Sequence, residues 1–586
     1  MENLKNKFDN AESIGVIGSP SSTGELTLDI LGTAVNKGLV GKISIFNYLQ
    51  DSKDHFALGQ ITEVIMQNIW TQDPTMRGII RQRGRVDPIT EKQDIHMAKM
   101  RISSVLAIDD NEIEPSIFGT VPSTGTSIKL LDDTLMDILF EKFKDQLFYL
   151  GKSYGTDIKM PMWFKHFGTG KTGAGEAYHI GIFGKTGSGK SVLAKMMMLG
   201  YAKHPEMSIF ILDPQGEFTR DIRNNDEIRS IIEKRYNRKI ELYDLHNLVL
   251  SNWLLFKKIL ANSEFFSRLG VIHITNKMQA ATEVQKALKS KKQVSSKITT
   301  FAGVSEKKSI TLPKTHEKSS FNKVWEFLGQ DNVQKMIYTS RDIRQRFQNN
   351  YQNAYLSEYY EIWKKIANLF KYEGKKNAIN IYDLVEKIGG DSKNIIIIDL
   401  SETETPKDVL WNDSIKLIVI GEFINLITRE AEKRFRDNEV LNSLIIIDEA
   451  HRLAPRERTD NEDLESVKAK LIDGIRTTRK YGLGWMFISQ TLSSLDRRII
   501  EQLRIYIFGY GLGWGVERQA LREIIGGAED AIRLYQMFRD PQSGIGTRKY
   551  PFMTIGPISP LSFSGTPLFF NALDYPDEFT KVNFKI

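Results

Sequence analysis

The chain has 586 residues, of which 41% are hydrophobic and 26% are charged, with a formal net charge of +7 and no cysteine. The lack of cysteine excludes disulfides and thiolate metal sites, and the nine histidines show no metal-ligand spacing. We find neither a signal peptide nor an apolar run long enough to cross a bilayer, so we expect a cytoplasmic protein without membrane contact. The length predicts about three or four domains, or one large domain with insertions. The basic excess mildly favours a polyanionic partner.

Residues 1–135 are expected to form a small β domain that serves docking or assembly. Short runs rich in Val and Ile alternate there with turn residues, which is typical of a small barrel or a sandwich. Residues 136–176 are interpreted as a connector. The predicted strands are Ser13–Ile17, Glu25–Leu31, Gly41–Phe46, Phe56–Met66, Met100–Ile108 and Thr126–Leu131.

A glycine-rich motif follows the apolar run at 177–183. The motif is Gly184-Lys185-Thr186-Gly187-Ser188-Gly189-Lys190-Ser191, and Val192 completes the predicted nucleotide-binding set. It satisfies the phosphate-loop pattern G-x-x-x-x-G-K-[ST], in which glycines let backbone N–H groups face a polyphosphate at a helix N-terminus. We expect Lys190 to reach the outer phosphates and the Ser191 hydroxyl to bind magnesium. The sequence therefore predicts binding of a nucleoside triphosphate, taken here as ATP, with Mg²⁺.

From residue 177 onwards, near-continuous apolar strands alternate with helices, which predicts an α/β fold with a parallel sheet covered on both faces. We assign 177–244 and 391–556 to this core, and 557–586 to a C-terminal arm. A long helix is expected to begin near Pro406. The predicted strands and extended segments are Met207–Asp213, Asn394–Asp399, Ser443–Asp448, Gly484–Ser489, Arg504–Gly509 and Gly544–Gly556.

Residues 245–390 interrupt this alternation and are predicted to form a helical insertion. Its outer parts are helical and aromatic, as in Trp253–Ile259, Phe321–Leu328 and Tyr351–Phe370. Its middle, Lys286–Lys318, is crowded with Lys, Ser and Thr. We interpret that middle as a solvated, partly disordered excursion, with direct DNA contact as the alternative.

Hydrolysis also needs an acid beside the magnesium and a base that aligns the attacking water. The segment LIIIDEAH ends a buried strand in adjacent carboxylates, so Asp448 is predicted to lie by the magnesium and Glu449 to activate the water. Asp399 ends another strand but has no acidic neighbour, so it is the weaker candidate. The alternative for Asp448 and Glu449 is a purely structural role at the end of a buried strand. Asp213 and Glu217 are expected to shape the same cleft. Predicted strands lie between the phosphate loop and the LIIIDEAH segment. We therefore expect the branch of phosphate-loop ATPases that has additional strands and a catalytic glutamate.

Three further polar positions are candidates for the same chemistry. Arg476, Arg479 and Lys480 have helical spacing, and cations there could simply stabilise a helix C-terminus. We favour an arginine finger offered to the ATP of a neighbouring subunit, with Arg479 preferred over Arg476. Gln490, at the end of the next strand, is predicted to sense the γ-phosphate, with a turn amide as the alternative.

Together these motifs resemble the HerA family, within the HerA–FtsK group of hexameric DNA-pumping ATPases. The resemblance rests on GKTGSGKS, DPQGEF at 213–218, LIIIDEAHRLAP at 444–455, RKYGLG at 479–484, SQ at 489–490 and the β-rich start with IGVIGSP. It covers nearly the whole chain. It implies a RecA-like core, a ring with ATP between subunits, and double-stranded DNA in a central pore. It also implies a nuclease or sirtuin-like effector docked on the barrel face, acting in DNA end processing or antiphage defence.

Two other functions fit the same motifs. The first is an ATP-binding ring scaffold that assembles and regulates an effector with little translocation. The second is a secretion or conjugation ATPase of related fold, although the lack of an apolar span disfavours the membrane-coupled type.

Overall fold

The computed structural model describes residues 2–84, 93–109, 112–170, 172–224, 226–290, 309–338, 340–390, 392–543, 548–562 and 565–584. The chain forms two compact units. Unit 1 comprises Met1–Ala174, Tyr178–Lys203 and Met486–Ile586, and unit 2 comprises Gly175–Ala177 and His204–Trp485. The domain boundaries expected from the sequence stay a prediction.

The first part of unit 1 is a closed six-stranded antiparallel barrel in the order β2-β1-β7-β3-β4-β5, and β5 pairs back with β2. Closure leaves no free edge within the ring, and β6 extends it from β5. The predicted barrel is therefore confirmed. Its elements are α1 (Glu2–Asn10), β1 (Ser13–Ile17), β2 (Leu26–Ile30), β3 (Ile43–Gln50), β4 (Lys53–Gln67), β5 (Ile95–Asp109), β6 (Glu112–Ser116) and β7 (Ser127–Leu130).

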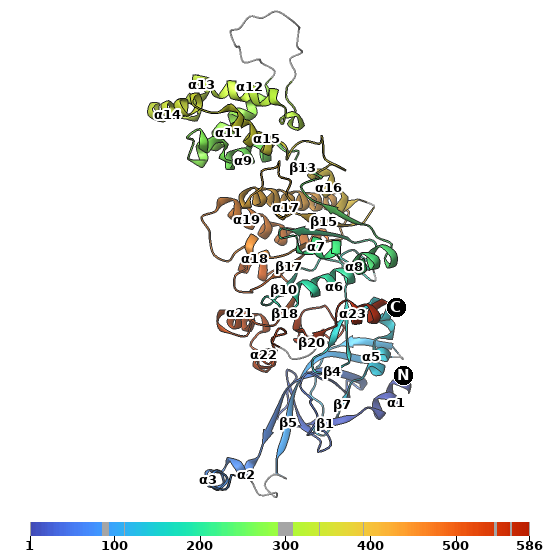
Figure 1. Cartoon of the computed structure of the whole chain (residues 1–586). Helices are drawn as coiled ribbons and strands as arrows, with labels where there is room; N and C mark the ends of the chain where they lie inside the picture. Colours follow the sequence, from blue (N-terminus) through green and yellow to red (C-terminus); the bar gives the residue numbers. More distant parts are fainter. Residues whose placement is uncertain are drawn as a thin grey trace, which may run out of the picture. The chain divides into compact units, whose positions relative to one another are not determined.

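Side chains that alternate along these strands fill the barrel, and Phe46, Ile61, Met100 and Ile128 are almost fully buried. Beyond the barrel, β4 and β5 continue as a two-stranded ribbon that carries α2 (Ile69–Gln72) and α3 (Pro74–Arg83) near its end (Figure 1). We call the described residues 64–84 and 93–96 the arm. Neither α2 nor α3 contains a buried residue.

The second part of unit 1 carries the glycine-rich motif. Its strands follow the order β17-β10-β18-β19-β20-β8-β9, with β17, β10 and β18 parallel and the remaining strands antiparallel. We did not predict β8 and β9, which lie in the expected connector. The elements are α5 (Asp133–Leu139), η1 (Glu141–Gln146), β8 (Leu147–Ser153), β9 (Lys159–Trp163), β10 (Ile180–Phe183), α6 (Lys190–Ala202), β17 (Leu483–Ser489, entering from unit 2), α20 (Arg497–Ile500), β18 (Ile505–Gly509), α21 (Gly515–Ile525), α22 (Glu529–Gln536), β19 (Pro551–Ile555), β20 (Leu568–Ala572) and α23 (Asp577–Phe584).

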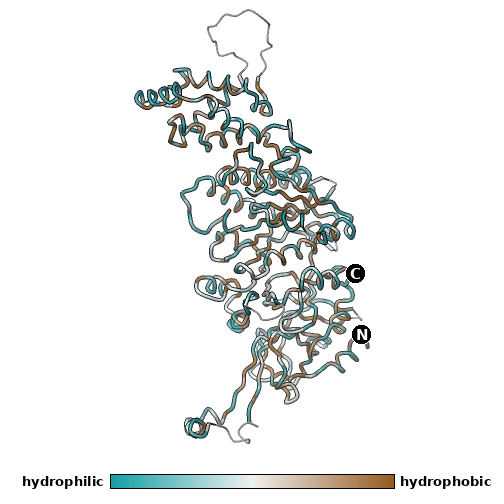
Figure 2. The backbone as a smooth tube through the Cα atoms, viewed as in Figure 1, coloured by the Kyte–Doolittle hydropathy of each residue, from teal (hydrophilic) through white to brown (hydrophobic). Residues whose placement is uncertain are grey.

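Unit 2 contains four parallel strands in the order β12-β15-β11-β16. Every residue of β11, β15 and β16 is buried, and these strands are among the most hydrophobic segments in Figure 2. This confirms the predicted parallel α/β core. Its elements are β11 (Ser208–Asp213), α7 (Glu217–Asn224), α8 (Asp226–Ser230), η2 (Ile231–Arg235), β12 (Ile240–Tyr243), β15 (Ile395–Asp399), α17 (Asp413–Arg436), β16 (Ser443–Ile447), α18 (Ala450–Leu453), α19 (Glu462–Thr478) and η4 (Arg479–Tyr481).

The predicted insertion is helical and has an aromatic core of its own. Trp363 is fully buried against Phe256 and Phe265, and its indole N–H donates to the Thr315 carbonyl at 2.8 Å. Most of the lysine-rich stretch, 291–308, lies outside the described residues. The elements are β13 (Leu248–Val249), α9 (Trp253–Asn262), α10 (Glu264–Arg268), α11 (Ile274–Lys289), η3 (Leu312–Lys314), α12 (Lys318–Leu328), α13 (Asp331–Ile337), α14 (Arg341–Gln352), α15 (Leu356–Ala367), β14 (Ile379–Asn380) and α16 (Ile381–Gly389).

The start of the long helix α17 differs from the prediction. Pro406 lies in a turn, where its carbonyl accepts the Val409 N–H at 3.1 Å, and the helix begins at Asp413. Asn412 sets this start because its side chain accepts the Ile415 N–H at 3.0 Å. Within the described residues, no helix combines the length and the apolarity that crossing a membrane requires.

Candidate functional site: a phosphate loop and a buried acidic pair

The phosphate loop joins β10 to α6 in unit 1, as predicted. Gly187 and Gly189 have φ angles of +82° and +88°, a backbone region that favours glycine. Gly189 is also the N-cap of α6, and among the described residues no side chain caps that helix. The helix dipole favours an anion at this end of α6.

Lys190 and Lys185 hold the loop closed in different ways. The Lys190 ammonium donates to the Lys185 carbonyl at 3.1 Å, and the Lys190 side chain is largely buried. The Lys185 N–H donates to the Tyr510 carbonyl, just beyond β18, at 2.9 Å. Ser191 and Val192 lie in the first turn of α6. The predicted nucleotide-binding residues thus form one folded cradle.

Two residues that we did not predict pack on this cradle. A Cβ at Gly187 would lie 2.1 Å from the Gln542 side chain, and a Cβ at Gly189 would lie 2.8 Å from the Tyr550 ring. Gln542 and Tyr550 belong to the segment between α22 and β19, which has no recognisable motif. Their approach follows from the tertiary fold, so no signal in the sequence could have identified them.

Gln490 lies beside the loop as well. Strand β17 runs parallel to β10 with Ser489 opposite Phe183, so Gln490 follows at the carboxyl edge of the sheet. The Thr186 hydroxyl donates to Gln490 Oε1 at 3.3 Å. Ligands of parallel α/β sheets bind at this edge.

The acidic pair lies in unit 2, at the carboxyl end of β16. Asp448 is 2% exposed, and its Oδ1 accepts the Glu449 N–H at 2.8 Å. Its Oδ2 is buried and has no hydrogen-bond partner among the described residues. Burial raises the pKa of Asp448 to about 7; the hydrogen bond from Glu449 opposes this shift, and the nearby charges of Glu217, Glu449 and Asp213 add to it. A buried carboxylate oxygen without a partner fits a hard cation such as magnesium, with its water shell.

Asp213 and Asp399 end neighbouring strands but have other roles in the fold. Asp213 accepts three hydrogen bonds, from the Gly216 N–H and from the N–H and hydroxyl of Thr219, all within 2.9 Å. Asp399 accepts the Ser401 N–H at 2.9 Å. Asp213 thus shapes the β11–α7 turn, and of the three aspartates Asp448 has the carboxylate best suited to a ligand.

Glu449 adopts an unusual backbone conformation for a residue with a side chain, with φ at +50°. Its carboxylate lies 3.4 Å from His451 Nδ1 and 3.9 Å from Arg452 Nε. Both acids line a cavity of about 230 Å³ together with Gln215, Lys416 and Arg452. Strain of this kind is often found at functional sites, where surrounding structure holds it.

The predicted finger residues lie elsewhere in unit 2. Arg479 is half-exposed, and its Nη2 lies 2.6 Å from the Glu176 carboxylate. Lys480 stacks over the rings of Phe435 and Tyr481. Arg479, Arg476 and Lys480 are not among the residues lining the acidic cavity. Within the described part of one chain, these cations and the acidic pair do not form a single site.

Residues 177–427 match the family profile described as "Helicase HerA, central domain". The similar solved structures include the genome packaging NTPase B204 from Sulfolobus turreted icosahedral virus 2 in complex with AMPPCP, at 11% identity over 68% of this chain and 98% of that chain, with a TM-score of 0.28. They also include VirB4 of Thermoanaerobacter pseudethanolicus (14% identity, 74% and 97% coverage, TM-score 0.38) and the bacterial conjugative coupling protein TrwB (10% identity, 67% and 84% coverage, TM-score 0.34).

No curated protein matches the chain. The family match begins at the apolar run before the phosphate loop and extends through the insertion into α17. It confirms the resemblance on which the motifs agreed. Residues 177–427 therefore resemble the central domain of the HerA family, whose members are ATP-binding, phosphate-loop ATPases.

Proposed function

We propose that this protein is an ATPase that assembles into a hexameric ring and moves double-stranded DNA. It works with a nuclease or another effector in DNA end processing or antiphage defence. The observation that carries the proposal is the combination of an intact phosphate loop with the buried Asp448–Glu449 pair in a chain whose central domain is of the HerA family. A protein that only binds ATP would not require the Asp448–Glu449 pair, because such acids serve hydrolysis.

Each residue then has a distinct role. The N–H groups of the phosphate loop and the Lys190 ammonium would hold the phosphates, and the Ser191 hydroxyl and Asp448 would hold magnesium with its water. When bound, magnesium neutralises charge that develops on the phosphates. Glu449 would orient a water and accept its proton as the water attacks the γ-phosphorus, while the bond from that phosphorus to the bridging oxygen breaks and ADP leaves. Gln490 would contact the γ-phosphate, and loss of that contact after hydrolysis would change the position of the end of β17.

Arg479 is proposed to act in the neighbouring subunit. Its guanidinium is half-exposed and pairs only at the surface with Glu176, so little free energy opposes its release to another partner. A cation placed against the γ-phosphate stabilises the charge of phosphoryl transfer. The surface that carries Arg479 differs from the surface that receives it, so contacts of this kind are heterologous. Heterologous contacts close into a ring when the rotation between successive subunits allows closure.

The arm supports a protein partner on the barrel face. Ile69 and Trp70 of α2 are 65% and 57% exposed, and Met66 on the adjoining strand is 58% exposed. Short helices without buried residues are marginally stable in water, so α2 and α3 need a surface to pack on. The exposed apolar side chains match the composition of protein interfaces, in which aromatic and Met residues are enriched.

Double-stranded DNA is expected to stimulate ATP hydrolysis by the full-length protein several-fold, and longer duplexes are expected to stimulate it more until a plateau. A translocating motor turns over repeatedly on a long track, whereas a short duplex ends each run. The stimulation should fall steeply between about 50 and 200 mM salt, because binding to phosphates releases counterions. Steady-state ATPase assays over a series of duplex lengths measure this.

Lys190→Ala is the control for contaminating ATPases, and it should hydrolyse no ATP on any duplex. If DNA leaves the rate of hydrolysis unchanged, both with and without the effector, the result would instead support a ring scaffold that regulates the effector through ATP binding. Stimulation that does not depend on duplex length would support DNA binding without translocation.

A further inference from the structure

Helix α22 contacts the barrel through its first turn and the neighbourhood of the phosphate loop through its last turn. We propose that α22 couples the barrel to the nucleotide site, with Asp530 as the positioning residue at the barrel and Tyr535 as the positioning residue at the loop. This inference rests on the binding of nucleotide at the phosphate loop. All residues involved belong to unit 1.

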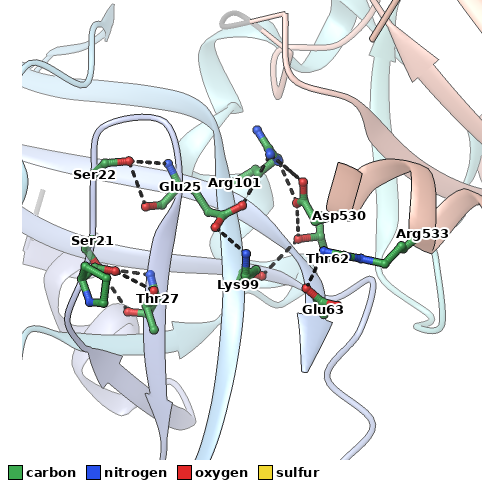
Figure 3. Close-up of polar contacts among 11 residues, drawn as sticks. Ser21, Ser22, Glu25, Thr27, Thr62, Glu63, Lys99, Arg101, Asp530 and Arg533 are labelled. Carbon is green, nitrogen blue, oxygen red and sulfur yellow. Dashed lines mark hydrogen bonds and ion pairs between the residues drawn. The ribbon is translucent and has the colours of Figure 1, made fainter. Parts of the chain in front are cut away.

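The buried carboxylate of Asp530 is attached to the barrel by an ion pair with the partly buried Arg101. Arg101 of β5 donates from Nε to both carboxylate oxygens, at 2.9 and 2.7 Å, and from Nη2 to Oδ1 at 2.5 Å. The Thr62 hydroxyl of β4 donates to Oδ2 at 2.7 Å. Asp530 is 2% exposed, and Figure 3 shows these groups converging on it from two barrel strands.

Arg101 also contacts Glu25, the residue directly before strand β2. Its Nη2 lies 3.4 Å from Glu25, next to β2, and Lys99 lies 2.9 Å from the same carboxylate (Figure 3). A buried charge that loses its partner is strongly destabilised, so Asp530 is bound to the geometry of the barrel wall. A shift of β4 or β5 therefore moves the first turn of α22.

Tyr535, one and a half turns later, is fastened to the end of β18. Its hydroxyl donates to the Gly509 carbonyl at 2.5 Å and accepts the Leu512 N–H at 3.0 Å. Tyr535 is also 2% exposed, so water cannot replace these hydrogen bonds. The ring thereby fixes the backbone of 509–512.

This backbone lies directly against the phosphate loop. The Tyr510 carbonyl accepts the Lys185 N–H at 2.9 Å. A Cβ added to Gly509 would lie 3.2 Å from Ser188 Oγ, and one added to Gly511 would lie 2.6 Å from the Lys185 side chain. The loop therefore has no room to change shape without moving 509–512, and through Tyr535 the helix α22.

The consequence is reciprocal coupling. If a ligand of the barrel shifts β4 and β5, the affinity for ATP changes, and ATP must change the affinity of the barrel for that ligand by the same factor. The same helix offers a matched control, because Arg533 also reaches β4, where it lies 3.2 Å from Glu63. Figure 3 shows this pair near Asp530, and it contributes little to stability because the Arg533 side chain is more than half exposed.

The experiment measures the affinity of a fluorescent ATP analogue with Mg²⁺ for the full-length wild type, Asp530→Asn, Tyr535→Phe, the double variant and Arg533→Ala. We expect each single variant to bind the analogue about tenfold more weakly, because each detaches one end of α22 and so frees the 509–512 backbone that contacts the phosphate loop. Arg533→Ala should stay within about twofold of the wild type. The double variant should lose little more than either single variant, since both act through one helix.

Circular dichroism and thermal unfolding establish that each variant is folded. If Asp530→Asn does not fold, Arg101→Lys keeps the charge but removes the two-pronged contact, and it should weaken nucleotide binding in the same direction. A merely structural brace would lower the unfolding temperature without changing the affinity. Additive losses in the double variant, or normal affinity in the folded Asp530→Asn, would overturn the coupling. A wild type that does not bind the analogue would overturn the nucleotide site as well.

Discussion

Glu449→Gln is expected to lower kcat for ATP hydrolysis by about a hundredfold to ten-thousandfold while the protein still binds ATP. Glutamine has the shape of glutamate, so the turn at 448–450 and the walls of the acidic cavity are kept. It cannot accept the proton of the attacking water, which is the role proposed for Glu449. Steady-state hydrolysis and titration with a fluorescent ATP analogue measure the two effects separately.

Glu217→Gln is the matched control for this result. Its charge acts on Asp448, but it is not among the residues that line the acidic cavity. We expect this variant to keep most of the hydrolysis rate. Native hydrolysis by Glu449→Gln would show that another group activates the water.

The second large effect is expected for Asp448→Asn, which should abolish hydrolysis but stabilise the protein free of metal and nucleotide at about pH 8. Burial raises the pKa of this carboxyl to about 7, whereas an unfolded aspartate has an ordinary value near 4. The folded state therefore holds the proton more tightly, and the contribution of this group to stability is full below about pH 4 and lost as pH rises through about 7. At about pH 8 the buried charge costs on the order of 4 kcal/mol, and asparagine removes that cost.

The measurement is the thermal unfolding midpoint of both proteins between about pH 5 and pH 8 in the presence of a chelator. The midpoint of Asp448→Asn should exceed that of the wild type at the alkaline end, and the difference should shrink toward the acidic end. Burial also raises the pKa of Asp213, but its carboxylate accepts three hydrogen bonds, and the NH₂ group of an asparagine could not accept those made to one of the two oxygens. Asp213→Asn is therefore the contrasting variant, and its midpoint should fall below that of the wild type. Equal midpoints of Asp448→Asn and wild type at every pH would contradict the buried charge.

The parts of the fold that follow local patterns could be predicted from the sequence. Alternating or continuous apolar runs located most barrel strands and most strands of the parallel core, because burial on one or both faces leaves that pattern. The parallel edge strand β12 was not predicted, and none of its residues is fully buried. The short strands β8 and β9 were missed, since glycine and proline interrupt them and a distant partner, β20, stabilises β8. The start of α17 was misplaced because Pro406 and Asn412 are both typical helix-start residues. The helix begins after Asn412, whose side chain accepts the Ile415 N–H.

The candidate site divides in the same way. The phosphate loop is contiguous in sequence, and its function depends on its own backbone, so its residues could be read directly. The packing of Gln542 and Tyr550 on the loop, and the pairing of Arg101 with Asp530 across 429 positions, depend on contacts that only the fold creates. The preference for Asp448 over Asp399 was predicted from adjacent carboxylates, and the geometry adds a physical ground in the buried oxygen without a partner.

The central claim is that the phosphate loop and the acidic pair of one subunit work with Arg479 of the next. The most direct test mixes two inactive full-length variants, Glu449→Gln and Arg479→Ala, in equal amounts under conditions in which subunits exchange. At random, about a quarter of the interfaces then pair an intact Glu449 with an intact Arg479, so the mixture should regain about a quarter of the wild-type hydrolysis rate. A mixture that hydrolyses ATP no faster than its two components would contradict a site shared between subunits.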